Sequence, residues 1–338
     1  MRFPEFTERW DTYRIADILC IGNGRDYKHL SKGDIPVFGT GGYMTSVNEC
    51  LYEGETTFIG RKGTINKPFY YNGKFWTVDT LFYTHSFKRV IPKFVYCLFQ
   101  TINWLRYNEA SGVPSLSKDT IEKIKVRIPQ LDEQKKIAKL LSLLDERIAT
   151  QNKIIEKLES LIKGIAQNVA RNNKPNIRLS ECLECSSSTL QESDVCENGT
   201  YPVYGANGIV GYLDNYNAEK EAVYIIKDGS GVGTVSYVTG KCSATGTLNT
   251  LQAKEGYSLQ YLYYMLKVFN FEPYKTGMAI PHIYFKDYGK AKIFCPSYTE
   301  QLKYVGVLST IDNKLSAEQS ILTDLSLQKQ YLLHQMFI

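Results

Sequence analysis

The chain of 338 residues is one module of about 167 residues written twice in tandem. The segment 36–39 (Pro-Val-Phe-Gly) recurs as 202–205 (Pro-Val-Tyr-Gly), 166 positions later. Further pairs recur at a shift of 166 or 167: 58–63 with 224–229, 80–81 with 247–248, 113–116 with 280–283, and Pro129-x3-Glu133-Gln134 with Pro296-x3-Glu300-Gln301. Two copies account for nearly the whole length, so the fold must be built from two similar units.

Each copy has the same internal order. Short apolar runs at 56–60, 75–83, 222–226 and 247–252 predict β-strands joined by glycine turns. A short helix should follow, with Pro92 at its first position, Phe94, Leu98 and Leu105 along it, and Ser258 capping its counterpart. A linker that ends in proline then leads to a long helix that begins near Glu133 or Glu300.

The two long helices carry an apolar seam with a period of 3.5 residues. Such a period over about five heptads favours a coiled coil, because a helix packed on its own domain shows a wider face of period 3.6. The nearest partner of matching length is the other copy. The predicted core positions are Ile137, Leu141, Leu144, Ile148, Gln151, Ile155, Leu158, Leu308, Ile311, Leu315, Glu318, Leu322 and Leu325.

Composition is that of an ordinary globular protein, with 43% hydrophobic and 22% charged residues. No run is long enough to cross a bilayer and no signal peptide is recognisable, so a cytoplasmic location is expected. The net charge of +5 is uneven, because residues 1–130 carry +5 and residues 175–296 carry −2. This distribution permits contact with a polyanion without establishing it.

The motifs that would make the chain an enzyme are missing from the sequence. Segment 228–233 (DGSGVG) is neither type of phosphate-binding glycine loop, and the β-branched residues after it favour a strand-to-strand turn. Methyltransferase tetrapeptides and a nuclease core are not found, and the four histidines lack metal spacing. Cys182 and Cys185 form a C-x2-C without a second close pair, so packed thiols are favoured over zinc. No catalytic residue and no metal site are predicted.

Basic, small and aromatic residues do recur in the loops. Segments 61–64 (RKGT) and 227–230 (KDGS) place cations and hydroxyls beside exposed backbone N–H groups, which can hold phosphates and reach base edges. The candidate DNA-binding residues are Arg61, Lys62, Thr64, Lys67, Lys74, Lys227, Ser230, Lys241 and Lys275. Many of the 25 tyrosines are also expected in turns, namely Tyr43, Tyr70, Tyr71, Tyr212, Tyr216 and Tyr274.

The order, doubling and spacing of these features resemble the specificity subunits of Type I restriction–modification systems. The resemblance rests on segments 36–39 and 202–205, on 113–116 and 280–283, and on the two Pro-x3-Glu-Gln helix starts, and it covers essentially the whole chain. It implies an α+β fold of two tandem mixed α/β target-recognition domains, each followed by a long helix. The two helices would form an antiparallel coiled coil with pseudo-two-fold symmetry. The expected divisions are 1–130, 131–174, 175–297 and 298–338.

The same resemblance implies a function and partners. Each recognition domain would read one half of a bipartite target in double-stranded DNA, and the paired helices would dock two methyltransferase subunits. S-adenosylmethionine would bind to those methyltransferases and not to this chain, and motor/endonuclease subunits would complete the complex. The chain itself would be a non-catalytic recognition subunit, with no membrane partner. Gln151 and Glu318 are equivalent seam positions, and in an antiparallel coil they should lie in neighbouring layers near the two-fold axis.

Two alternatives from other classes are kept. A repeat-built protein could use tyrosine-rich loops to bind a sugar or a peptide, which would give no salt-dependent duplex binding. A DNA-modifying enzyme with unrecognised active residues would show methyl transfer or strand cleavage by the purified chain alone.

Overall fold

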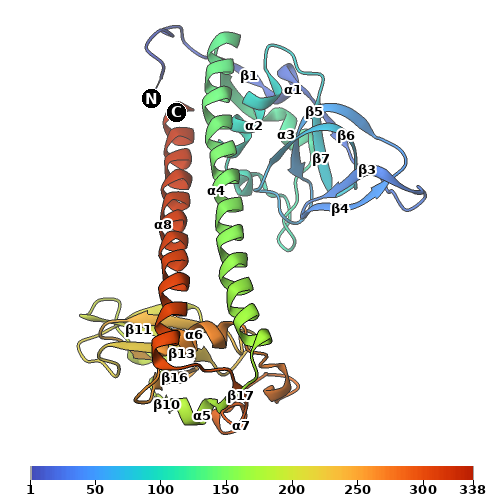
Figure 1. Cartoon of the computed structure of the whole chain (residues 1–338). Coiled ribbons are helices and arrows are strands. Elements are labelled where there is room, and N and C mark those ends of the chain that lie inside the picture. Colours follow the sequence, from blue (N-terminus) through green and yellow to red (C-terminus); the bar gives the residue numbers. More distant parts are fainter. Residues whose placement is uncertain (1, 338) are drawn as a thin grey trace. The chain divides into compact units, whose positions relative to one another are not determined.

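The computed structural model describes residues 2–337 (Figure 1). The internal contacts divide the chain into two compact units. Unit 1 consists of Met1–Asn152 with Ser320–Ile338, and unit 2 consists of Lys153–Gln319. The long helices α4 (Leu131–Asn172) and α8 (Tyr298–Met336) are each divided between the two units.

Unit 1 is built on a six-stranded sheet in the order β2-β7-β5-β6-β3-β4. Its strands are β2 (Cys20–Asn23), β3 (Lys32–Gly39), β4 (Gly42–Val47), β5 (Tyr52–Gly60), β6 (Phe69–Thr77) and β7 (Leu81–His85). The β3–β6 pair is parallel, with Val37 opposite Trp76, and the other neighbours are antiparallel. The remaining elements are β1 (Asp11–Arg14), α1 (Ile15–Ile18), α2 (Pro92–Thr101), the 3₁₀ helix η1 (Trp104–Tyr107), α3 (Lys118–Lys123) and β8 (Lys125–Ile128).

Unit 2 repeats this topology with its sheet broken in two. One sheet has the order β10-β16-β13-β14 and the other β12-β11-β15. The parallel pair recurs, because Val203 of β11 lies opposite Ser243 of β15, as Val37 lies opposite Trp76. The elements are β9 (Ile177–Arg178), α5 (Leu179–Cys182), β10 (Leu183–Ser187), η2 (Glu192–Asp194), β11 (Tyr201–Gly205), β12 (Gly208–Leu213), β13 (Glu221–Ile226), β14 (Val235–Thr239), β15 (Ser243–Ala244), β16 (Leu248–Ala253), α6 (Leu259–Lys267), η3 (Glu272–Tyr274), α7 (Phe285–Tyr288) and β17 (Lys292–Ile293). The turn predicted at 228–233 joins the antiparallel strands β13 and β14, so that prediction is confirmed.

Several local predictions need correction. The run 75–83 is not one strand, because Leu81 N–H donates to the Val78 carbonyl (3.0 Å) in a turn between β6 and β7. Leu105 lies beyond α2, in η1, and is exposed. Four of the tyrosines predicted in turns lie in strands instead: Tyr43 in β4, Tyr70 and Tyr71 in β6, and Tyr212 in β12. The caps are confirmed, since Pro92 begins α2 and the Ser258 hydroxyl accepts from Tyr261 N–H at 3.3 Å.

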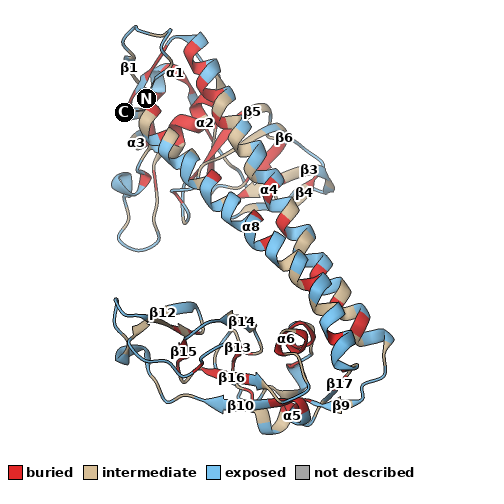
Figure 2. Cartoon of the chain, turned by 60° about the vertical axis from the view of Figure 1, so that its left-hand side comes forward, coloured by how far each residue is buried: buried red, intermediate tan, exposed pale blue. Residues whose placement is uncertain are grey.

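The core of unit 1 joins its short helices and strands to both long helices. Buried Phe94 and Phe99 of α2 share one apolar cluster with Ile137 and Leu141 of α4. The same cluster contains two residues from the last turns of α8, Leu333 and Met336. Buried residues accordingly follow one stripe along α4 in Figure 2. The last turns of α8 are therefore part of the core of the first recognition domain.

The two long helices run antiparallel within each unit. In unit 1, Lys329 of α8 forms an ion pair with Asp145 of α4 (2.5 Å), while the later residues Leu333 and Met336 reach the earlier Ile137 and Leu141. In unit 2, the second half of α4 and the first half of α8 line one cavity of about 500 Å³, to which Ile162 and Leu315 contribute. The fold class predicted from the sequence, α+β with paired antiparallel helices, is thereby confirmed.

None of the predicted seam positions is fully exposed. The buried ones are Ile137, Leu141, Gln151, Ile155, Leu308, Leu315, Glu318 and Leu325, and the half-buried ones are Leu144, Ile148, Leu158, Ile311 and Leu322. Lys329 also falls on the heptad pattern, and its ammonium bonds to Asp145 and to the Gln100 side chain (2.8 Å). The seam therefore contains polar positions, and the charge of Lys329 among them is paired.

The repeated Pro-x3-Glu-Gln motif ties each long helix to the short helix before it. Gln134 is fully buried, and its side chain donates to the carbonyls of Arg89 (2.9 Å) and Pro129 (2.8 Å) and accepts from Ile91 N–H (3.0 Å). In unit 2, Gln301 donates to the Pro296 carbonyl and accepts from Ser258 N–H, both at 2.9 Å. The motif is a structural joint, which explains its recurrence.

Among the described residues, no helix is long and apolar enough to cross a membrane. The C-x2-C pair is packed into unit 2. Burial raises the pKa of the Cys182 thiol to about 12 and that of the Cys185 thiol to about 11. Cys182 donates to the carbonyls of Arg178 (3.5 Å) and Leu179 (3.4 Å), so it behaves as a protonated thiol inside a helical turn.

Candidate nucleic-acid interface

Two of the repeated motifs lie side by side in unit 1 although about fifty residues separate them in the sequence. We name residues 61–64 loop A and residues 109–116 loop B. Gly63 N–H of loop A donates to the Pro114 carbonyl of loop B (2.8 Å), and Leu116 N–H donates back to the Arg61 carbonyl (2.9 Å). Lys62 and Ser115 form an antiparallel bridge between these bonds. The two loops are thus one structural feature.

Unit 2 contains the same pairing, atom for atom. Its loop A is residues 227–230 and its loop B is residues 276–283. Gly229 N–H donates to the Pro281 carbonyl, and Ile283 N–H donates to the Lys227 carbonyl, both at 2.9 Å. Asp228 and His282 form the bridge. Gly63 and Gly229 have φ of +92° and +94°, a left-handed conformation that disfavours a side chain, which is why both copies carry glycine there.

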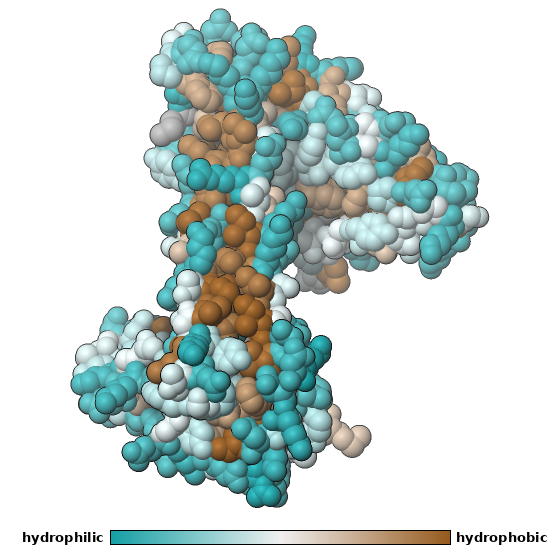
Figure 3. Space-filling model, in the orientation of Figure 1, coloured by the Kyte–Doolittle hydropathy of each residue, from teal (hydrophilic) through white to brown (hydrophobic). Residues whose placement is uncertain are grey.

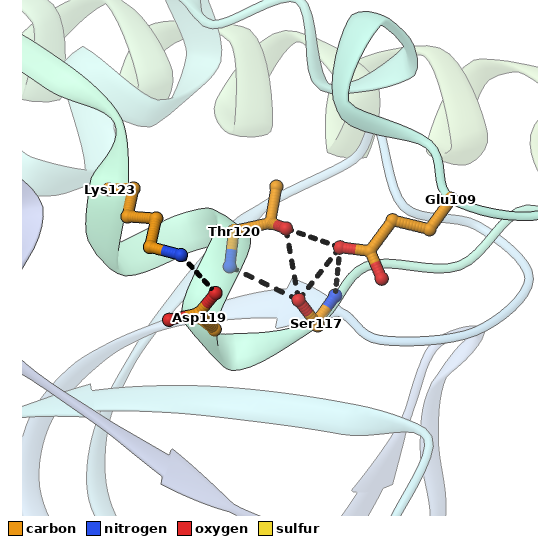
Figure 4. A network of polar contacts seen from close by, with 5 residues as sticks. All are labelled: Glu109, Ser117, Asp119, Thr120 and Lys123. Carbon is orange, nitrogen blue, oxygen red and sulfur yellow. Dashed lines mark hydrogen bonds and ion pairs between the residues drawn. The ribbon is translucent and has the colours of Figure 1, made fainter.

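Loop B of unit 1 is held at its base by a polar network (Figure 4). The Glu109 carboxylate accepts from the hydroxyls of Thr120 and Ser117 (2.7 Å to Ser117) and from Ser117 N–H (3.3 Å). These bonds, with Thr120 first, lower the pKa of the Glu109 carboxyl below its usual range. Ser117 also caps α3 by accepting from Thr120 N–H. In unit 2 the positions equivalent to Glu109 and Ser117 hold Thr276 and Tyr284, so this network belongs to unit 1 alone.

A cleft of about 680 Å³ opens between loop A and the base of loop B in unit 1. Its lining includes three cations, Arg61, Lys62 and Lys118, and two carboxylates, Asp79 and Glu109. The Arg61 guanidinium donates to the Asp79 carbonyl (3.2 Å) and lies over the Phe82 ring. A cation oriented in this way, beside loop hydroxyls, can contact a phosphate or the acceptor edge of a guanine.

The structure brings some of the candidate DNA-binding residues together and leaves others apart. Arg61, Lys62 and Thr64 form loop A of unit 1, and Lys227 and Ser230 belong to loop A of unit 2. Lys67 lies in the link between loop A of unit 1 and β6, and Lys275 directly precedes loop B of unit 2 in an ion pair with Glu272 (2.5 Å).

Two of the candidates lie outside the paired loops. Lys74 is in β6 and forms an ion pair with Glu53 of β5 at 3.9 Å. Lys241 stacks over the rings of Tyr216 (4.5 Å) and Tyr201 (5.8 Å). The contacts of both side chains are thus made with strands and rings of their own unit, away from loop A and loop B.

Sequence reasoning missed Met278, at the tip of loop B in unit 2. It singled out 113–116 and 280–283 but not the residues just before them. Three apolar side chains at the tips are largely exposed, namely Val113 in unit 1 and Met278 and Ile280 in unit 2. Val113 and Ile280 are matched positions of the repeat, whereas Met278 lies opposite Ser111, so a search for repeats passes over Met278.

Comparison with known proteins agrees with this doubling. Residues 7–160 and 175–326 each match the family described as the Type I restriction modification DNA specificity domain. The chain belongs to this family. Each match falls on one copy of the repeat and includes both loop A and loop B of that copy. The paired loops are therefore part of each specificity domain.

Relatives of known name match shorter stretches. The chain is 34% identical over 123 residues to the Type I restriction enzyme MjaVIII specificity subunit of Methanocaldococcus jannaschii, covering 35% of this chain and 27% of the relative. It is 27% identical over 116 residues to the Type I restriction enzyme EcoprrI specificity subunit of Escherichia coli, covering 34% of this chain and 29% of the relative. These matches thus span less than a third of either relative.

Solved structures with this fold cover the whole chain. The S subunit of a Type I restriction–modification system from M. genitalium superimposes with a TM-score of 0.74 at 17% identity, covering 100% of this chain and 99% of that one. A chain from a structure of complex assembly and conformational transition of the type I R-M system gives a TM-score of 0.53 at 15% identity, covering 98% of both chains. At such identities the likeness concerns the fold.

Proposed function

We propose that this chain is the DNA sequence-specificity subunit of a Type I restriction–modification complex and reads a bipartite duplex target, one half-site with each unit. The observation that carries the proposal is the pairing of loop A with loop B through the same backbone atoms in both units. Two copies of one exposed, cation-bearing feature suit a target with two parts. The loop residues differ between the copies, as two different half-sites require.

The charges of the loops give each unit a way to bind the DNA backbone. Arg61, Lys62 and Lys227 present cations beside loop N–H groups, which is the combination that contacts phosphates. Loop A of unit 2 also carries Asp228, and the segment 175–296 is net acidic. Because phosphate neutralisation dominates affinity for DNA, we expect unit 2 to contribute less to affinity than unit 1. Tight binding should therefore need the assembled complex.

The long helices are the proposed docking surface for two methyltransferase subunits. Figure 3 shows apolar side chains gathered on these helices. In unit 2 Leu161 of α4 remains exposed, and in unit 1 Leu327 and Tyr331 remain exposed on the corresponding stretch of α8, about 167 residues later. Exposed apolar side chains of this size on a helix favour burial against a partner. Leu143 of α4 in unit 1 and Val307 of α8 in unit 2 are also exposed, so the long helices of each unit offer apolar side chains to one methyltransferase.

The remaining parts of the complex follow from the same proposal. S-adenosylmethionine binds to the methyltransferases, motor and endonuclease subunits join the assembly, and this chain supplies recognition without a catalytic group. The sequence motifs of methyltransferases and nucleases, which this chain lacks, support that division of labour.

Mapping of methylated bases in a host with and without this gene tests the proposal. We expect a two-part motif that is methylated only when the gene is present, and methylation that ignores the gene would refute the proposal. Docking is tested by co-purification with the methyltransferase, where Leu161→Asp should lower the stoichiometry from two methyltransferases to one. Ile209→Asp is the matched control, because Ile209 is similarly exposed but lies in β12 and not on a helix.

A further inference from the structure

The tip of loop B in unit 2 is the most exposed apolar feature among the described residues. Met278 is 107% exposed and Ile280 is 65% exposed. Both side chains leave the same turn of the backbone, with Ala279 between them. Single exposed apolar residues are ordinary on a protein surface, but two such neighbours at the tip of one loop favour burial against a binding partner.

A pair of backbone hydrogen bonds closes the base of the loop that carries them. Thr276 N–H donates to the His282 carbonyl (2.9 Å), and His282 N–H donates back to the Thr276 carbonyl (2.8 Å), which closes a two-stranded ribbon. Gly277 has φ of +89°, and a Cβ at this position would meet the Ile280 carbonyl oxygen at 2.3 Å. The bonds at the base restrict the backbone of the loop before any partner arrives, which reduces the entropy cost of binding.

The base of this ribbon is attached to the cationic loop. Ile283 N–H bonds to the carbonyl of Lys227, and Lys275 directly precedes the ribbon. If Lys227 contacts the DNA backbone, the ribbon bonded to it lies close to the duplex. The major groove of B-DNA admits a two-stranded ribbon, whereas the minor groove is about half as wide. In the major groove, the apolar group offered by the base pairs is the C5-methyl of thymine.

Unit 1 has only one of the two apolar side chains at the equivalent tip, because Val113 matches Ile280 while Ser111 takes the place of Met278. Its residues 110–113 are Ala-Ser-Gly-Val, and only Val113 among these described residues is a large exposed apolar side chain. Its loop is held by the Asn108 side chain, which accepts from Ala110 N–H (3.1 Å) and Ser115 N–H (2.9 Å). The frame of the loop is the same, but the chemistry at its tip differs. Two units that read different half-sites need different side chains at the tip of loop B.

We propose that Met278 and Ile280 determine specificity by packing against thymine C5-methyl groups in the major groove of the half-site read by unit 2. This inference rests on the proposed function and adds the class of base to it. A thymine methyl that packs against an apolar side chain is shielded from water, and its removal should weaken binding by about four-fold.

The first experiment maps methylated motifs in a host that carries the partner subunits and the variant Met278→Ala/Ile280→Ala. We expect one half of the motif to become degenerate at a T·A position while the other half is unchanged. Ile209→Ala, a change at an exposed apolar residue in strand β12 of unit 2, should leave both halves intact. An unchanged motif, or relaxation at a G·C pair, would overturn the inference. Methylation that never depends on this gene would instead refute the proposed function, so the two failures are distinct.

The second experiment changes the DNA and not the protein, so its main readout on the wild-type complex does not depend on the folding of a variant. Each thymine of the mapped motif is replaced in turn by deoxyuridine, which lacks only the methyl group, and binding is measured. We expect about four-fold weaker binding for at least one thymine in the half-site of unit 2, with no such weakening for the Met278→Ala/Ile280→Ala complex. Equal affinities for all deoxyuridine duplexes would overturn the proposal. A rise in the fluorescence of 2-aminopurine in the duplex would also overturn it, because it would indicate that the side chains insert between base pairs instead of packing against methyl groups.

Discussion

Replacement of the buried glutamine at the start of each long helix measures how strongly that helix is fixed to its recognition domain. Gln134→Leu removes three hydrogen bonds to backbone groups, of which the one to the Pro129 carbonyl is fully buried, and Gln301→Leu removes two that are partly buried. At about 1 kcal/mol or more for each hydrogen bond removed, we expect the free energy of unfolding to fall by at least about 3 and about 2 kcal/mol. Unit 1 should therefore be destabilised more than unit 2 by the matched change.

The assay is calorimetric unfolding together with hydrogen exchange at the first turns of α2 and α6. For a unit of this size, about 3 kcal/mol lowers the melting temperature by roughly 6–12 °C. Exchange should accelerate near Ile91 in one variant and near Ser258 in the other, because each N–H is deprived of its acceptor there. A destabilisation below about 0.5 kcal/mol, or a larger one for Gln301→Leu, would refute this account of the motif.

A charged variant adds a test with a definite sign. In Gln134→Glu a buried carboxylate would face the carbonyl oxygens of Arg89 and Pro129, so the pKa of the new group should be raised in the folded state. A raised folded-state pKa means that stability is lost as the pH rises through that pKa. The glutamate variant should therefore gain stability relative to Gln134→Leu when the pH is lowered from about 7 to about 5. A constant difference between the two variants across this range would contradict the reasoning.

Three further predictions concern binding and the seam. The pure chain should neither bind nor transfer the methyl group of labelled S-adenosylmethionine, and transfer to duplex DNA above background would refute a non-catalytic role. Replacement of Arg61, Lys62 or Lys227 by Ala should lower the slope of log affinity against log salt concentration by about one for each phosphate that is no longer neutralised. An unchanged slope would mean that the replaced residue does not contact a phosphate. Buried Gln151 and Glu318 should specify the register of the paired helices at a cost in stability. Replacing both by Leu should therefore raise the melting temperature and loosen discrimination between spacer lengths. A lower melting temperature would argue against this role.

The repeat made the architecture predictable from the sequence, because each weak local pattern occurs twice at nearly the same spacing. The heptad positions, the caps at Pro92 and Ser258 and the turn at 228–233 all follow from patterns that involve neighbouring residues. The pairing of loop A with loop B could not be read in the same way. Both motifs were visible, but the hydrogen bonds that join Gly63 to Pro114 and Leu116 to Arg61 connect positions about fifty residues apart.

Features present in only one copy were the hardest to predict. Lys329 lies where the other copy has Ile162. Its ammonium pairs with the Asp145 carboxylate and donates to the Gln100 side chain, and both partners are far away in the sequence. The Glu109 network and the apolar tip at Met278 also belong to one copy each. A comparison of copies discards such differences, although differences between the units are what would distinguish two half-sites.

The division of unit 1 into two stretches of chain has a consequence for its synthesis on the ribosome. Unit 2 is one continuous stretch, Lys153–Gln319, and can complete its packing as soon as that stretch has emerged. Unit 1 must wait for Leu333 and Met336, which pack against Ile137 and Leu141. Until then the nascent first domain exposes an apolar stripe of α4, which makes it a substrate for chaperones and proteases. A ribosome that stops before the last turns of α8 would thus release a chain whose second unit is folded and whose first unit still exposes apolar residues to proteases.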